Sequence, residues 1–204
     1  MSENSGSVAY RENFAALLND VIQYRERTDN IQSNMEKKIT DFGTEMQADD
    51  AAVVITPGLL NAVGTGCFQI SQRSSAIASM IMSRAQQLFP DEPVTAEIDD
   101  PVGFEMQDVP QPRNVSRIIS PAAVQTWRQL SDDLIVGKTA VEDTYNGFLS
   151  SYLTNRDCLG GGRWPEALHD SITALGETVK GFGDALQNCA SQIRSVADYV
   201  ESLL

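Results

Sequence analysis

Apolar residues recur at alternating intervals of four and three along the last part of the chain. A repeat of about 3.5 residues, kept over some five heptads, is typical of a helix that faces other helices along its whole length. The pattern therefore predicts one long helix that opens near Pro165 and Glu166 and carries an interaction seam. The seam consists of Leu168, Ile172, Leu175, Val179, Phe182, Leu186, Cys189, Ile193, Val196, Val200 and Leu203.

The positions beside this seam are small or uncharged, although a two-stranded coiled coil normally carries Glu and Lys there. Among them, Gly176 and Gly183 are expected to allow close packing of a neighbouring helix. The charged residues fall at the outermost heptad positions instead. The helix should therefore pack against at least two others, either inside an ordinary bundle or in a multi-subunit assembly.

A second, weaker seam near the start of the chain predicts a helix over about Val8–Ala48. Its main positions lie seven residues apart, at Phe14, Val21, Thr28, Met35 and Phe42. Lys38 and Glu45 interrupt the apolar pattern without abolishing it. This helix is also expected to pack along its length against a neighbour.

The next segment, Ala51–Phe68, is apolar but contains Pro57 and several glycines. We therefore expect a turn there, with a short helical piece at Leu59–Val63. A further helix is predicted over about Gln69–Phe89. Residues 9–89 would then form an N-terminal helical hairpin.

The composition changes sharply over residues 90–119. Five of the eight prolines lie between Pro90 and Pro112, together with seven acidic side chains and, up to residue 113, one basic side chain. No regular helix can run through such a stretch. It is predicted to be an acidic, proline-rich linker or loop, either disordered or ordered with short strands near Val94–Ile98 and Val102–Met106.

Ser120 and Pro121 provide a helix start, with serine as the N-cap and proline in the first turn. An apolar stripe continues to about Tyr152, and the run of glycines at 160–162 ends the helical pattern. Residues 120–204 would thus form a C-terminal helical hairpin. The predicted fold class is all-α: long antiparallel hairpins in a coiled-coil-like bundle, with a proline-rich acidic loop inserted.

The net charge of the chain disfavours certain classes of binding partner. With 15 basic and 28 acidic residues, the net charge is −13, which disfavours nucleic acid and anionic lipid. No run of eighteen apolar residues occurs, so no stable membrane insertion is expected. Residues 1–8, rich in Ser and Asn, are predicted to be disordered and lack the pattern of a signal peptide. Localisation is left open between the cytoplasm and secretion without a classical signal peptide.

No motif assigns a catalytic, cofactor-binding or metal-ligating residue. Glu166 and His169 have the Glu-x-x-His spacing of di-iron bundles, but the second histidine that such a site needs does not occur. Cys158 would need His169 to fold back towards it to become a nucleophile. The sequence Gly64-Thr65-Gly66 lacks the lysine of a phosphate-binding loop. Acidic pairs such as Asp49-Asp50, Asp99-Asp100 and Asp132-Asp133 are expected to be solvated.

The layout resembles that of the filament and tip proteins of type III secretion systems. The matching parts are the Ser/Asn-rich start, the seam from Phe14 to Phe42, and the heptads from Leu168 to Leu203. The resemblance implies that the first and last helices form a coiled coil and that subunits stack into an extracellular tube or tip. The chain departs from this plan in its long third helix and in its cysteines.

Residues 120–204 also resemble the Trp-x-Gly helical-hairpin substrates of type VII secretion. Trp164 matches the tryptophan at the turn of that family, while Glu166 stands where the family has glycine. The usual C-terminal export signal is also missing, because Tyr199 is followed four residues later by Leu203 and not by an acidic residue. This resemblance covers only the C-terminal hairpin.

The sequence therefore favours a non-enzymatic helical structural protein that binds a protein partner, copies of itself, or both. A secretion-system subunit, or a secreted helical substrate that self-assembles through its long helices, is the leading hypothesis. An intracellular adaptor or chaperone that binds an apolar helix of a partner is the alternative. A bundle enzyme or metal carrier is a third class, and it would require a bound metal or cofactor.

Overall fold

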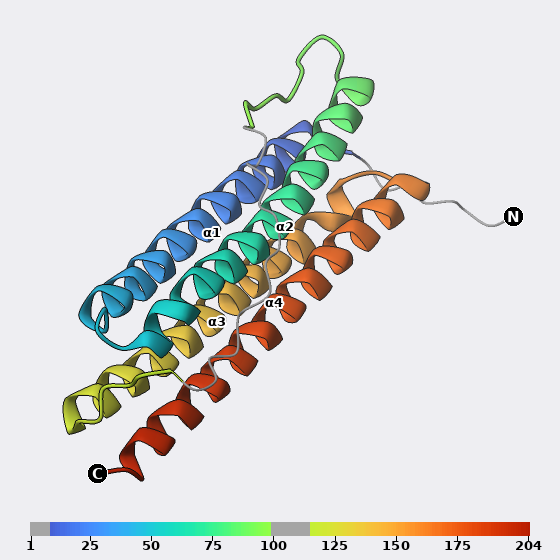
Figure 1. The fold of residues 1–204 in the computed structure, drawn as a ribbon. Coiled ribbons are helices and arrows are strands. Elements are labelled where there is room, and N and C mark those ends of the chain that lie inside the picture. The colour runs from blue at the N-terminus through green and yellow to red at the C-terminus, as the bar shows by residue number, and fades with distance from the viewer. Residues whose placement is uncertain (1–8, 99–114) are drawn as a thin grey trace, which may run out of the picture.

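The computed structural model describes residues 9–98 and 115–204. Within them the chain is built from long helices, so the predicted all-α fold class is confirmed (Figure 1). The single pairing of extended backbone in this part of the chain is an isolated bridge between Ala9 and Leu159. The helices are α1 (Arg11–Glu45), α2 (Asp50–Leu88), α3 (Pro121–Asn155), the short 3-10 helix η1 (Arg156–Cys158) and α4 (Arg163–Glu201).

The four long helices form a bundle in which each helix lies beside two others. Helix α1 packs against α2 and α3, and α4 packs against α3 and α2 (Figure 1). The start of α1 lies beside the end of α3, where the Asn13 amide donates to Asn155 at 2.9 Å. Helices α1 and α3 are therefore antiparallel. The pairs α1–α2 and α3–α4 are consecutive hairpins and are antiparallel as well, which makes α2 antiparallel to α4.

The connection between α2 and α3 joins opposite ends of this bundle. Helix α2 ends beside the start of α1, where the rings of Phe14 and Phe89 are 5.9 Å apart. Helix α3 begins beside the α1–α2 turn, where the Asp50 amide donates to the Ser116 carbonyl at 3.1 Å. The fold is thus a four-helix bundle with one long crossover. The expected disorder at 1–8 and the expected strand near Val102–Met106 lie outside the described ranges. The other expected strand, Val94–Ile98, is wrong: this stretch forms no strand, and its Val94 side chain is buried in the core of the bundle instead.

Two local signals predicted for the C-terminal hairpin are confirmed: the start of its first helix at Ser120, and the glycine turn between its two helices. The Ser120 hydroxyl accepts a hydrogen bond from the Ala123 amide at 3.1 Å, with Pro121 in the first turn. Between η1 and α4, Gly160 and Gly162 have φ angles of 85° and 94°, which side chains disfavour. Helix α4 begins two residues before the expected Pro165.

The expected turn within Ala51–Phe68 is wrong, because α2 runs through this segment without a break. Pro57 lies on the solvent-facing side of α2, and this lowers the free-energy cost of the helical hydrogen bond that proline cannot form. Pro57 cannot donate to the carbonyl of Val53, and both residues are exposed, so water can bind that carbonyl. The glycines that suggested a turn are buried inside α2, and Gly66 makes room there for Phe182 of α4.

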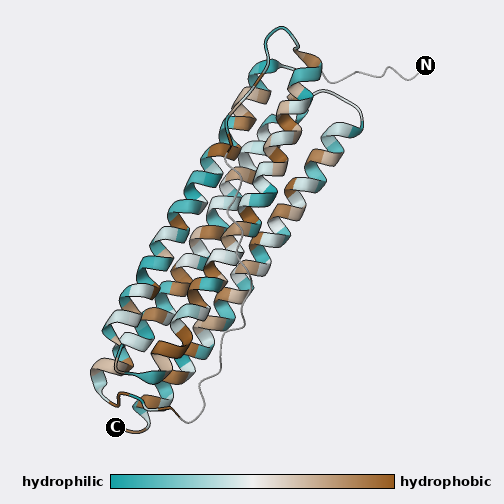
Figure 2. Cartoon of the chain, turned by 45° about the horizontal axis from the view of Figure 1, so that its top comes forward, coloured by the Kyte–Doolittle hydropathy of each residue, from teal (hydrophilic) through white to brown (hydrophobic). Residues whose placement is uncertain are grey.

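A single hydrophobic core runs the length of the bundle and takes side chains from all four helices. Apolar residues line the inner faces of the helices, and hydrophilic residues lie outside (Figure 2). The five heptad-spaced residues of α1 are all buried, which confirms the weaker seam despite Lys38 and Glu45.

Each of the four helix–helix interfaces contains a glycine whose missing side chain makes room for a residue of the neighbouring helix. A Cβ atom added at any of these glycines would overlap that residue. The overlap at Gly66 involves the aromatic ring of Phe182, which is itself buried and has little freedom to move. The pairs are Gly43 with Thr56, Gly137 with Met35, Gly66 with Phe182, and Gly176 with Tyr145.

Asp49 connects the α1–α2 turn to the segment that leads into α3. Its side chain is fully buried, contrary to the expected solvated acidic pair. One carboxylate oxygen accepts from the Ala51 and Ala52 amides at 3.0 and 3.1 Å, and so caps α2. The other accepts from the Ile118 amide at 3.0 Å. These hydrogen bonds compensate the burial of the charge.

We predict that Gly66→Ala lowers the free energy of unfolding by about 1–3 kcal/mol, because the new methyl group displaces the Phe182 ring. The matched control is Gly181→Ala on α4, where an added Cβ meets no atom within 4 Å. This control should raise stability by up to about 1 kcal/mol through helix propensity. Urea unfolding followed by circular dichroism checks both; equal effects of the two substitutions would contradict the proposed packing.

We predict that Asp49→Ala destabilises the fold by about 2–4 kcal/mol, since two buried amide donors and one half-buried donor lose their acceptor. The adjacent Asp50→Ala should cost less than about 1 kcal/mol, because Asp50 is exposed and its carboxylate accepts only a longer bond from Ser116. Urea unfolding of both variants makes the comparison. A loss at Asp50 as large as that at Asp49 would rule out the special role of Asp49.

Candidate interaction surface

The predicted interaction seam of α4 is mostly covered by the chain itself. Eight of its eleven positions are buried against the other helices: Leu168, Ile172, Leu175, Val179, Phe182, Leu186, Ile193 and Val200. Cys189 and Val196 are half-buried. Leu203 is 46% exposed and lies beyond the last residue of α4. The seam is therefore satisfied largely within one chain.

The buried face of α4 is wider than the seam. Gly183, Ala190 and Ala197, which flank the seam on one side, are also buried. The expectation that the helix packs against at least two others is confirmed, since α4 contacts both α3 and α2. A face of this width cannot be covered by one helix alone.

The two glycines beside the seam face α3. At Gly176 the missing side chain lets the Tyr145 hydroxyl reach the Ile172 carbonyl, to which it donates at 3.1 Å. At Gly183 the nearest atom to an added Cβ would be a carboxylate oxygen of Glu142, at 2.7 Å. Glu142 is a flexible side chain that can move away, so Gly176 is the more constrained of the two positions.

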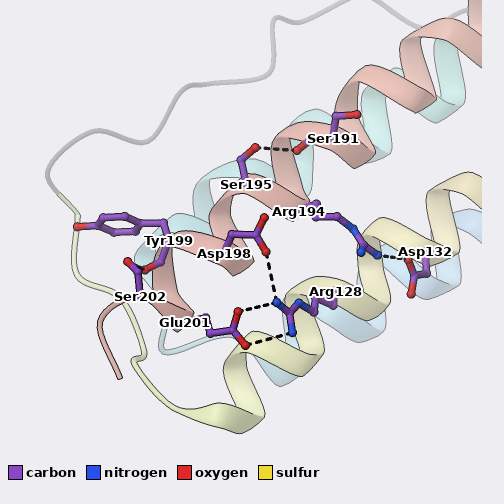
Figure 3. A network of polar contacts seen from close by, with 9 residues as sticks. All are labelled: Arg128, Asp132, Ser191, Arg194, Ser195, Asp198, Tyr199, Glu201 and Ser202. Atoms are coloured by element: carbon purple, nitrogen blue, oxygen red, sulfur yellow. Dashed lines mark hydrogen bonds and ion pairs between the residues drawn. The ribbon is translucent and has the colours of Figure 1, made fainter.

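On the outer surface, ion pairs connect α3 to the carboxyl-terminal part of α4 (Figure 3). The Arg128 guanidinium donates to the carboxylates of Glu201 and Asp198, at 2.7 and 3.3 Å. The hydrogen bonds that Arg128 donates to Glu201 and Asp198 raise the pKa of Arg128 above its ordinary value. Arg194 pairs with Asp132 in the same way. Because these pairs are exposed, each contributes little stability.

The sole histidine belongs to an aromatic contact. The rings of His169 and Tyr152 are stacked with centroids 5.9 Å apart, and the tyrosine hydroxyl lies 3.4 Å from Nδ1. Glu166, its partner in the Glu-x-x-His pattern, is exposed. Within the described ranges, no group of three possible metal-ligating side chains comes together. Cys158 and His169, both in the described part of the chain, form no hydrogen bond with each other.

The sequence Gly64-Thr65-Gly66 lies in the middle of α2 and is buried, so it forms no loop. Helix α2 is also the one helix, among the residues described, that is long and apolar enough to cross a membrane. This is weak evidence for a span, because 56% of its most apolar window is buried inside the bundle, as in a core helix.

A buried thiol and a buried phenol lie on the inner faces of α2 and α1. Burial raises the pKa of the Cys67 thiol to about 12, and the acidic residues Glu36 and Asp29 add to this shift. Burial likewise raises the pKa of Tyr24 well above its ordinary range. A protonated, inaccessible thiol is a poor nucleophile, so Cys67 packs as a small apolar side chain.

The outer surface has one feature that the sequence analysis missed, a groove between α1 and α3. Its upper part, nearer the middle of α1, is a hollow of about 350 Å³. The surface of this hollow is mainly apolar, although Asn34, Lys37, Lys38 and Asp133 also line it. Its lower part, beside the carboxyl end of α1, is a hollow of about 330 Å³, in which acidic residues outnumber basic ones. The two parts adjoin each other, because both are lined by Lys38 and Asp133, whose ion pair of 3.8 Å joins α1 to α3 where the two hollows meet.

Two signals in the sequence mark this groove. Val136 lies outside the apolar stripe of α3 and is 67% exposed, more than any other large apolar residue in the described ranges. Asp41 and Glu45 lie near the carboxyl end of α1, where the helix dipole disfavours negative charge. Neither signal is specific until the fold places the two helices side by side.

We predict that stability falls as the pH rises above 9.0, the ordinary pKa of a cysteine thiol. The unfolded chain loses the Cys67 proton there, whereas the folded protein keeps it until about pH 12, so alkali favours unfolding. The expected slope is about 1.4 kcal/mol per pH unit for this group. Urea unfolding across this range should show a shallower slope for Cys67→Ala than for the half-buried control Cys158→Ala. Identical slopes would contradict the prediction.

Comparison of the chain with known protein families, curated proteins and solved structures finds no match in any of the three.

Proposed function

We propose that this chain is a non-enzymatic helical protein that acts by binding other protein molecules through the outer surface of a folded bundle. The observation that supports this proposal is the burial of the α4 seam within one chain. A seam that is already covered is not free to recruit a partner, so binding has to use residues that the bundle leaves exposed. Protein secretion is the setting that the sequence resemblances suggest, either as a subunit of the apparatus or as a secreted substrate.

Self-assembly of such a protein would join prefolded bundles. Copies carrying a net charge of −13 repel one another at low ionic strength, so contacts between them need apolar or neutral surface. Exposed apolar side chains are present just before the start of α3 and at the carboxyl end of the chain. They are Ile119, Tyr199, Leu203 and Leu204. Assembly through these residues would leave the core unchanged.

The second candidate is an adaptor or chaperone that holds a helix of another protein. The α1–α3 groove favours this candidate, because it combines an apolar hollow with a charged one on the outside of a stable bundle. A closed bundle would be folded before the partner arrives. This differs from an adaptor that gains its stability only on binding.

The experiment is light scattering after size-exclusion chromatography, combined with thermal unfolding, over a wide range of protein concentration. At concentrations where light scattering shows a monomer, we expect the chain to be fully helical and its unfolding temperature to be independent of concentration, because the core closes within one chain. Any larger species should keep the helical content of the monomer. Loss of the helical structure at concentrations where light scattering shows only monomer would mean that the seam is completed by a second chain, and would overturn the proposal.

A further inference from the structure

We propose that the groove between α1 and α3 binds an amphipathic helix of another protein, with apolar residues in one half and lysine or arginine in the other. This inference rests on the proposed function and adds the surface and the chemistry of the partner. The groove runs from Ile31 to Glu45 on α1 and from Gln125 to Ala140 on α3. At about 1.5 Å per residue, this is roughly 20 Å, or about four turns of helix.

The upper half of the groove suits apolar side chains. Its rim carries Val136, and its other wall carries the half-buried Ile31. Met35 forms part of the floor, filling the space beside Gly137. A methionine floor adapts readily to different apolar side chains. Exposure of Val136 to water is unfavourable, and an apolar partner would relieve it.

The lower half suits a basic partner. Asp41, Glu45 and Asp133 line it, opposed by Lys38 alone. Asp133 interacts with Lys38 and with the Gln129 amide, whereas Asp41 forms no ion pair among the described residues. Glu45 accepts one hydrogen bond, from the Thr126 hydroxyl at 2.7 Å, and retains capacity for further donors.

The position of these carboxylates on α1 strengthens the argument. Asp41 and Glu45 lie at the negative end of the helix dipole, and no basic residue occupies the last turn. The protein alone therefore concentrates negative potential at this point at some cost to its own helix. Lysine or arginine from a partner would neutralise it. The overall charge of −13 further favours a basic partner and disfavours a second copy of the chain.

The test uses two fluorescein-labelled synthetic peptides of about 15 residues, a length matched to the groove. Both carry leucine and alanine on one face of the first half. The second half carries lysine in one peptide and glutamate in the other. Fluorescence anisotropy against the full-length chain at low ionic strength measures their affinities. We expect the lysine peptide to bind at least about tenfold more tightly than the glutamate peptide.

Two variants and two matched controls locate the binding. Val136→Asp and Asp41→Lys should each weaken binding of the lysine peptide about tenfold. The controls Val53→Asp and Asp184→Lys make the same changes at exposed positions outside the groove and should alter affinity less than about twofold. All four positions are on the surface, so the variants should fold, which circular dichroism checks.

Three results would overturn the inference. The first is that neither peptide binds, or that both bind equally well. The second is that the groove variants and the controls weaken binding to the same extent. The third is that Val136→Asp abolishes a dimer of the unmodified protein, which would make a second copy the occupant. None of these results would by itself refute the proposed function, because the concentration series tests that independently and other outer surfaces remain.

Discussion

The width of the apolar face of α4 is the constraint on which the rest of the structure depends. The face includes the seam and the adjacent small residues Gly183, Ala190 and Ala197, so one partner helix cannot cover it. Helices α3 and α2 cover it together, and α1 closes the bundle on the other side. Close approach is possible because small residues face large ones, as Gly66 faces Phe182 and Gly176 faces Tyr145. The core is therefore a property of all four helices and not of either hairpin alone.

The crossover between the two hairpins follows from the same geometry. Helix α2 ends at one end of the bundle, and α3 must begin at the other to lie antiparallel to both α1 and α4. Asp49 fixes the segment that leads into α3 at that end of the bundle, because its carboxylate caps α2 and also accepts a hydrogen bond from the Ile118 amide. A single buried charge thus links a helix start to the return of the chain.

Closure of the core determines where function can reside. Most of the regularly spaced apolar residues pack inside the bundle. The described residues also contain no cluster of metal-ligating side chains. The surface between α1 and α3 is different. An exposed valine and carboxylates at the unfavourable end of a helix are both costs to the isolated protein. Binding of an apolar and basic helix would offset both costs at the same place.

The sequence by itself determined the helical class, the C-terminal hairpin and the inward face of α4, because heptad spacing and the signals at Ser120 and Gly160–Gly162 act over a few residues. The helical course of α2 through Pro57 was decided by tertiary packing, since buried glycines resemble turn glycines until a neighbouring helix is present. Burial of Asp49 likewise depends on a segment nearly seventy residues away, at Ile118. The α1–α3 groove could not be predicted either, because its walls come from helices about a hundred residues apart along the chain. Local patterns specify elements, whereas only the folded chain specifies which faces meet and which remain open.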